Sequence, residues 1–364
     1  MWSICGGSYS NAMRQKATCS MRWRNWKPIS WMVGRVWVVQ GSTKSEIALD
    51  LRQALSYAPS VSEFLALVEL GSNAVRCLVA SILPGVGFRV LQEARAQTRL
   101  SAGRPGILSP IAIGETSDTI RRFVREARRE YQPRILAVAT SAVRDATNRQ
   151  DLLEKLQREA GVSVRILSGL EEALLGTQAA LHSLSFRNGT VADLGGGSLQ
   201  LTHVREEEIS SAASMPLGAV RTTTRFFRND PPTEREIQSL RQEVHHQLAR
   251  NFSISAPSSE MIGLGGTIRT LGRMHLTTIN KQRSRQGLSL QRSDLSALRE
   301  RMERLPARER IQLGGLKEER VDIIVAGTIV IEEVMRLGNY RTLTVCTEGV
   351  RQGLLLRETF GRGI

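Results

Sequence analysis

A glycine-rich turn directly after a buried acidic residue occurs twice in this chain, and this repetition constrains the fold more than any other feature. The later copy is Val191–Ser198, which reads V-A-D-L-G-G-G-S, and the earlier copy is Val68–Asn73, which reads V-E-L-G-S-N. In both, an apolar run ends in an acid and small residues follow, as in a strand that enters a tight turn. We therefore expect two related half-domains that face each other across one cleft.

Similar elements follow the two turns. Each half has three short apolar strands separated by turn residues: Glu63–Leu70, Val75–Ile82 and Gly87–Glu93 in the first, and Thr190–Asp193, Leu199–Arg205 and Glu208–Ser214 in the second. Helices and further strands then alternate, so that the order β-β-β-α-β-α-β-α is seen roughly twice. This order predicts a duplicated α/β fold with one domain over residues 61–186 and a second over residues 187–364.

Residues 1–60 differ from the rest of the chain. They hold all five tryptophans and eight Lys or Arg residues, but only Glu46 and Asp50 as acids. One interpretation is a basic, aromatic arm for a membrane or nucleic acid. The other, which we favour, is a start codon assigned upstream of the true one. In either case we expect a poorly ordered extension.

The charge balance and the cysteines narrow the class of protein. The chain carries 50 Lys and Arg against 35 Asp and Glu, a net charge of +15, which favours anionic ligands. No Lys/Arg-rich run is interleaved with aromatic residues, so a specific nucleic-acid surface is not expected. The four cysteines show no CxxC spacing, which argues against a zinc site. No apolar stretch approaches the roughly 18 residues that span a bilayer, so we expect a cytoplasmic protein without a membrane partner.

Three small-residue turns supply candidate anion-binding groups. Glycine, serine and asparagine suit turns whose amide N–H groups point at an anion. A third turn lies between a short apolar strand and a helix, and a helix N-terminus attracts anions. The candidate phosphate-binding residues in these turns are Gly71, Ser72, Asn73, Gly195, Gly196, Gly197, Ser198, Gly266 and Thr267.

Charged residues near these turns suit phosphoryl transfer. Glu69 and Asp193 end their strands beside the turns, where carboxylates could hold Mg²⁺ directly or through its waters. Arg76 and Arg144 could clamp phosphate oxygens with two N–H donors each. The chain has no Walker A sequence, which excludes a P-loop nucleotide site.

Two adjacent glutamates open a predicted helix after Ser168. The sequence Ser168-Gly169-Leu170-Glu171 has the form of a capping box, which gives Glu171 a structural role. Glu172 has no such specific role and could orient a water molecule at the cleft. From these residues alone, we place the structural interpretation of Glu172 ahead of the catalytic one.

Six stretches carry a resemblance to a known family. They read VELGSNAVR (68–76), ATSAVRDATN (139–148), SGLEEA (168–173), VADLGGGS (191–198), GLGGT (263–267) and GVRQGLL (349–355). With them, the chain resembles the exopolyphosphatase/guanosine-pentaphosphate phosphatase family from about Leu65 to Glu358. The resemblance implies two ribonuclease-H-like domains of the actin-like ATPase superfamily, with a cleft between them.

The resemblance also implies an activity. It implies Mg²⁺-dependent release of the terminal phosphate of inorganic polyphosphate, or of the 5′-γ-phosphate of guanosine pentaphosphate, by a protein that is usually a dimer. Glu172 matches the second glutamate of the family's S-G-x-E-E-A, which implies that it is the general base. This match raises Glu172 above its helix-capping interpretation.

Three positions depart from the family pattern. The first acid is usually aspartate and here is Glu69; Gln200 stands where the second turn usually has glutamate; and Leu174 replaces a common arginine. These departures support an alternative, a protein that binds polyphosphate or alarmone nucleotides without efficient turnover. A third and weaker interpretation is an ATP-dependent kinase of the same fold, for which no acceptor-site motif is present.

Overall fold

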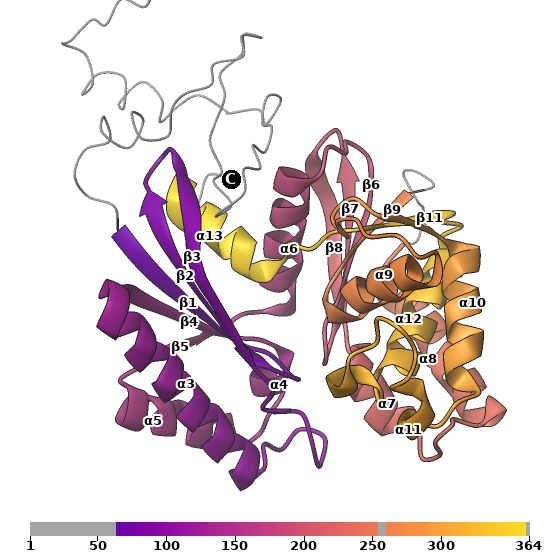
Figure 1. The fold of residues 1–364 in the computed structure, drawn as a ribbon, viewed down its shortest axis with the longest axis horizontal. Coiled ribbons are helices and arrows are strands. Elements are labelled where there is room, and N and C mark those ends of the chain that lie inside the picture. Colours follow the sequence, from indigo (N-terminus) through magenta and orange to yellow (C-terminus); the bar gives the residue numbers. More distant parts are fainter. Residues whose placement is uncertain (1–62, 254–259, 362–364) are drawn as a thin grey trace, which may run out of the picture.

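Two mixed β-sheets, one in each half of the chain, form the framework of the computed structural model, which describes residues 63–253 and 260–361 (Figure 1). The predicted extension over residues 1–60 lies outside the described residues. The first sheet contains β1 (Glu63–Leu70), β2 (Val75–Leu83), β3 (Gly87–Ala96), β4 (Arg134–Ala139) and β5 (Val164–Ile166). The second contains β6 (Gly189–Leu194), β7 (Leu199–Arg205), β8 (Glu208–Met215), β9 (Glu260–Leu264), β10 (Ser289–Gln291) and β11 (Thr342–Val345).

The two sheets share one topology. The first has the strand order β3-β2-β1-β4-β5, and the second has the order β10-β11-β9-β6-β7-β8. Read from β8, the second sheet repeats the order of the first, and β10 adds an antiparallel strand at the far edge. In each half, the first strand of the antiparallel meander also pairs with a parallel strand along its opposite edge: β1 with β4, and β6 with β9. The predicted duplicated α/β fold is confirmed.

Helices cover both faces of each sheet. The first half contributes α3 (Pro110–Tyr131), α4 (Ser141–Arg144), α5 (Arg149–Ala160) and α6 (Gly169–Ser183). The second half contributes α7 (Ala219–Phe226), α8 (Glu234–Asn251), α9 (Gly266–Thr278), α10 (Arg292–Glu303), α11 (Ala307–Arg310), α12 (Ile324–Leu337) and α13 (Val350–Phe360). One apolar core lies between the first sheet and α3 with α5, and another lies between the second sheet and α8, α9 and α12.

The helices α6 and α13 lie between the two sheets, and each packs on the sheet of the opposite half (Figure 1). The α6 helix packs on the second sheet, whereas α13, at the end of the chain, packs on the first. Their backbones approach closely, since a Cβ on Gly353 would lie 2.1 Å from the carbonyl oxygen of Leu175. The predicted boundary between residues 186 and 187 therefore separates the two sheets, but not the helices that cover them.

This packing explains which way the two strand-terminal acids face. On β1, Leu65 and Leu67 belong to the core under α13, so strand alternation puts Glu69 on the same side. On β6, Val191 packs with α6, so Asp193 faces that helix. Because α6 and α13 meet between the sheets, both acids point into the space between the two halves.

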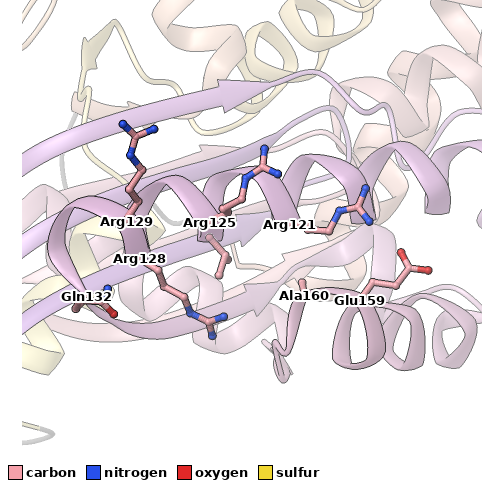
Figure 2. A pocket seen from close by; sticks show the side chains of 8 residues that line it. Arg121, Arg125, Arg128, Arg129, Gln132, Glu159 and Ala160 are labelled. Atoms are coloured by element: carbon pink, nitrogen blue, oxygen red, sulfur yellow. The ribbon is translucent and has the colours of Figure 1, made fainter.

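The arginines of α3 form an exposed face, as the sequence indicates. Arg121, Arg125, Arg128 and Arg129 line a shallow groove of about 320 Å³ beside Ala160 of α5. Figure 2 shows their guanidinium groups pointing in different directions rather than toward one point. Such an arrangement is typical of a solvated surface. Within the two described ranges, no helix is both long enough and apolar enough to cross a membrane.

Candidate active site

A cavity of about 90 Å³ lies between the two halves, where the carboxyl ends of β1 and β6 face each other. Most of the residues predicted from sequence line it: Glu69, Gly71, Ser72, Asn73, Arg76, Glu172, Asp193, Gly195, Gly196, Ser198 and Gly266. The other three, Arg144, Gly197 and Thr267, are absent from the lining. Arg144 contacts Glu172, Gly197 lies against Ser141 of α4, and the buried Thr267 packs against Gly327 of α12.

The two glycine turns are alike in their backbone bonding. In the first, the Gly71 amide donates to the Ala74 carbonyl at 3.1 Å. In the second, the Gly195 amide donates to the Ser198 carbonyl at 3.0 Å. In each turn, the amide of the first residue thus bonds to the carbonyl of the residue three positions later. This shared geometry supports the origin of the two halves by duplication.

Each turn has its carbonyl groups held from outside. In the second turn, the carbonyls of Gly195 and Gly196 accept from the amides of Ala219 and Val220, at 3.0 and 2.8 Å, at the start of α7. In the first turn the segment after β3 has the same role. There, the amides of residues 99 and 101 donate to the carbonyls of residues 73 and 72.

Holding the carbonyls from outside leaves amide N–H groups available for a ligand. Within the part of the chain that the structure describes, no acceptor is found for the amides of Ser72, Asn73, Gly196 or Ser198. Nδ2 of the Asn73 side chain is also buried without a hydrogen-bond partner in that part. Because buried donors are normally paired, these groups fit an anion such as a phosphoryl group.

Close contacts explain why the second turn needs glycine. A Cβ on Gly196 would lie 2.7 Å from the Ser72 Cβ of the opposite turn. A Cβ on Gly218, just before α7, would lie 2.3 Å from the backbone of Gly197. Gly218 cannot be singled out from the sequence, because its role depends on a contact between segments about twenty residues apart.

The carboxylate of Asp193 lies between two glycines. Ideal Cβ atoms on Gly176 of α6 and on Gly265, before α9, would lie 3.2 and 3.1 Å from its oxygens. Its side chain has no hydrogen bond or ion pair among the described residues. Burial raises the pKa of Asp193 to about 6, and the charge of Glu69 adds to the rise although Arg269 opposes it.

Glu69 is held by arginines. Arg76, its partner across β1 and β2, donates from Nη1 to both carboxylate oxygens at 3.0 and 3.1 Å. Nε of Arg351, from α13, lies 3.4 Å from Oε2. Burial alone would raise the pKa of Glu69, but these two charges outweigh it and hold the pKa below its usual value.

The two acids therefore differ as candidate ligands for a metal. The carboxylate of Asp193 makes no direct ion pair in the described chain, and it is a hard oxygen donor of the kind that Mg²⁺ prefers. Both oxygens of Glu69 already contact guanidinium groups. The described residues contain no cluster of three metal-binding side chains. Mg²⁺ often needs only one or two carboxylates when substrate phosphates and waters complete its shell, and Asp193 fits that arrangement.

Glu172 is suited to proton transfer. It lies in the first turn of α6, after the Ser168 capping box, which the structure confirms. Its side chain is 8% exposed and accepts a hydrogen bond from Nη1 of Arg144. Burial raises the pKa of Glu172 to about 7, although Arg144 opposes the rise. A carboxylate with this pKa can accept a proton near neutral pH.

Arginines that the sequence analysis did not assign complete the site. Nη1 of Arg269, one turn into α9, donates to the Thr347 carbonyl at 3.0 Å. The guanidinium of Arg320 lies over the start of α9, within 1.8 Å of where a Cβ on Gly266 would be. Burial and the neighbouring positive charges lower the pKa of Arg269 to about 10 and that of Arg320 to about 9. An anion would relieve this repulsion.

Known proteins show the same organisation. The model of the Ppx/GppA phosphatase family matches residues 78–360. The chain belongs to this family. Exopolyphosphatase 1 of Mycobacterium leprae is 31% identical over 301 residues, which are 81% of this chain and 89% of that protein. Exopolyphosphatase 2 of Mycobacterium tuberculosis is 28% identical over 313 residues, which are 80% and 97% of the two chains.

Solved structures agree with the fold. The crystal structure of the Aquifex aeolicus member of the Ppx/GppA family has a TM-score of 0.69 at 26% identity, over 82% of this chain and 98% of that one. A Cytophaga hutchinsonii exopolyphosphatase has a TM-score of 0.74 at 24% identity, with the same coverage, which is a likeness of fold.

Of the three departures from the Ppx/GppA pattern, Glu69 and Gln200 line the cavity and Leu174 does not. Gln200, on β7, lines the cavity, and its Nε2 donates to Ser198 Oγ at 2.8 Å and to Ser214 Oγ at 3.0 Å. Both hydroxyls are thereby tied to a neutral amide. Leu174, on α6, does not line the cavity.

A larger groove continues from the cavity. It has a volume of about 750 Å³ and shares Arg76, Arg269, Arg320 and Arg351 with the cavity lining. Its further basic residues are Arg95, Arg273, Arg285 and Lys317, against the acids Glu93, Glu319 and Glu348. Phe88 is its one aromatic lining residue in the described chain, and its side chain is buried.

Proposed function

We propose that this protein is a hydrolase that removes the terminal phosphate of inorganic polyphosphate with the assistance of Mg²⁺. The observation that carries the proposal is a small cavity with free amides, a carboxyl group of near-neutral pKa and a basic groove leading away from it. Pockets for drug-sized ligands have volumes of roughly 300–1,000 Å³. The cavity, at about 90 Å³, has room for one phosphoryl group and a few waters.

The chemistry assigns one task to each group. The two turns donate N–H groups to the oxygens of the terminal phosphoryl group, where negative charge is concentrated during transfer. Glu172 accepts a proton from a water molecule whose oxygen bonds to the phosphorus. The bridging P–O bond breaks, and its electron pair leaves with the shortened polyphosphate. One water is consumed, and one inorganic phosphate is released.

Asp193 is the residue that we propose holds the metal ion. Mg²⁺ bound there would neutralise phosphate charge, as in other phosphoryl-transfer enzymes. Glu69 keeps Arg76 and Arg351 directed at the cavity, where their guanidinium groups add positive charge.

The groove favours polyphosphate over guanosine pentaphosphate as the substrate. Its eight basic side chains face three acids, which suits a linear polyanion. A guanine base is usually stacked on an exposed aromatic ring or bound by free polar groups, and Phe88 is buried. Guanosine pentaphosphate presents the same terminal phosphoryl group, so the two substrates have to be compared directly.

Phosphate release from both substrates, with and without Mg²⁺, tests this function. We expect release from polyphosphate with the wild type and a loss of about 10²-fold or more in Glu172→Ala. Glu154→Ala, which removes an exposed acid from α5, is the matched control and should keep full activity. Equal rates in the wild type and Glu172→Ala would exclude Glu172 as the base, and faster release from guanosine pentaphosphate would reverse the substrate preference.

Gln200 supports a second candidate, a family member that binds polyphosphate without efficient turnover. Its amide ties up Ser198 and adds no charge where the family usually has a carboxylate. Binding of polyphosphate without turnover in the wild type, together with turnover in Gln200→Glu, would favour this candidate. Substantial turnover in the wild type would exclude it.

A further inference from the structure

Asp145 lies between two arginines that come from opposite halves of the molecule. It is the C-cap residue of α4, and its amide donates to the Ser141 carbonyl at 3.0 Å. Its Oδ1 lies 3.4 Å from Nε of Arg144, in its own half. Its Oδ2 accepts from Nη2 of Arg221, on α7 of the other half. A single carboxylate thus bridges the rim of the cleft.

The arginine on the far side of the cleft supports the second glycine turn. Nε of Arg221 donates to the Gly197 carbonyl at 2.8 Å, while its backbone amide donates to the Gly196 carbonyl at 3.0 Å. Gly197 in turn lies against α4, since a Cβ there would be 2.3 Å from Ser141 Oγ. The position of this turn relative to the first half therefore depends on contacts with α4.

The arginine on the near side supports the candidate base. Nη1 of Arg144 donates to the Leu167 carbonyl at 2.8 Å and also to Oε1 of Glu172. Asp145 contacts the Nε edge of the same guanidinium. The contacts run without a break from Glu172 through Arg144, Asp145 and Arg221 to the carbonyl of Gly197.

We infer that Asp145 is a positioning residue that fixes the second phosphate turn relative to Glu172 when the cleft is closed. This inference rests on the proposed function. Neither Asp145 nor Arg221 lines the cavity, so both act through other groups. Their side chains are 38% and 32% exposed, and ion pairs at such exposure add little to stability. Their effect should therefore be on geometry rather than on folding.

The kinetic test compares Asp145→Asn, Arg221→Gln and the double variant. A misplacement of about 1 Å can cost ~10²-fold in rate, so we expect each single variant to lose ~10- to 100-fold in kcat/KM. The double variant should lose no more than the worse single one, because both changes break the same bridge. Asp118→Asn, which breaks an exposed pair with Arg121 within α3, should lose nothing. Multiplicative losses, or no loss, would overturn the inference.

The pH profile separates positioning from simple charge removal. Glu172 faces Arg144 from α4, Asp193 from β6 and Glu69 from β1. If Asp145→Asn releases Arg144, the pKa of Glu172 rises and the acid limb of kcat/KM moves to higher pH. If Asp145 acts only by its negative charge, its removal lowers that pKa and the limb moves to lower pH. A downward or absent shift would contradict positioning.

Hydrogen exchange tests the bridge without any turnover. The hydrogen-bonded amides of Gly195, of residues 219–221 and of α4 should exchange several-fold faster in Asp145→Asn and in Arg221→Gln than in the wild type. Unchanged exchange would overturn the inference even in an active enzyme. If the wild type releases no phosphate, the proposed function fails, and exchange alone still decides whether the bridge holds the turn.

Discussion

At the scale of single residues, the raised pKa of Glu172 lowers the free energy of unfolding above neutral pH. Burial raises the pKa of its carboxyl group to about 7 in the folded chain, against an ordinary value of 4.5. The folded state therefore binds more protons than the unfolded state between these values. By linkage, the free energy of unfolding falls as the pH rises through this window. A buried carboxylate that is charged at pH 8 opposes folding there.

Glu172→Gln should reverse this effect. Its free energy of unfolding relative to that of the wild type should increase between pH 5 and pH 8 by up to about 3 kcal/mol, since one pKa unit corresponds to about 1.4 kcal/mol. Any constant cost of losing the contact with Arg144 cancels in this comparison. Urea unfolding at the two pH values, without Mg²⁺ or phosphate, measures the change. An equal difference at both pH values would show that the pKa of Glu172 is not raised.

Most of the residues predicted from the sequence line the cavity, because strand ends and small-residue turns are local patterns. Arg269 and Arg320 could not be predicted, since their position depends on how α9 and the segment before α12 pack. The sequence also does not show which side chains bind each other. Glu69 and Arg76 were assigned separate tasks, and only the register of β1 on β2 shows that they bind each other.

At the scale of elements, α7 serves the second turn rather than a ligand. Its first amides donate hydrogen bonds to the carbonyls of Gly195 and Gly196. The free N–H donors are therefore those of the turn and not those of the helix N-terminus. This requires the helix to start in contact with the turn. Gly218 allows that contact because it has no side chain.

Gly218→Ala should break this arrangement. The added Cβ would lie 2.3 Å from the Gly197 backbone, and overpacking of this kind costs about 1–3 kcal/mol. We expect lower stability and a larger loss of phosphate release. Gly114→Ala, inside α3 with no atom within 4 Å of the new Cβ, is the control and should stabilise the chain slightly. Similar effects of the two substitutions would refute this role of Gly218.

Some elements escaped prediction for identifiable reasons. Apolar residues at helical spacing predict a helix over residues 116–131, whereas α3 begins at Pro110, because Ser109 caps it and proline suits its first turn. Its first turn reads Pro-Ile-Ala-Ile and is followed by Gly114, so the apolar residues there do not follow a helical period. The strand β10 has three residues and exists through its pairing with β11, so no local pattern marks it. The four-residue α4 is equally short.

At the scale of the whole molecule, the basic groove should control substrate length. Arg285 and Lys317 line its part beyond the small cavity. The double substitution Arg285→Gln/Lys317→Gln should raise KM for long polyphosphate several-fold and weaken its dependence on salt, because fewer phosphates are neutralised. KM for tripolyphosphate should stay nearly unchanged.

The exposed groove on α3 offers a control of equal charge. Arg121→Gln/Arg125→Gln likewise removes two positive charges, but from the surface shown in Figure 2. It should leave KM for both substrates unchanged. An equal rise in both double variants would mean that net charge, rather than the groove beside the active site, attracts polyphosphate.

The crossing of α6 and α13 has a consequence for how the chain unfolds. One face of each sheet is covered by a helix from the opposite half. Neither half therefore has a complete core when the other has unfolded. Proteins with two separate cores commonly melt in steps. Here we expect one cooperative transition, with equal calorimetric and van't Hoff enthalpies. The enzyme would then lose both of its phosphate turns together, and no half-folded form would retain a working binding site.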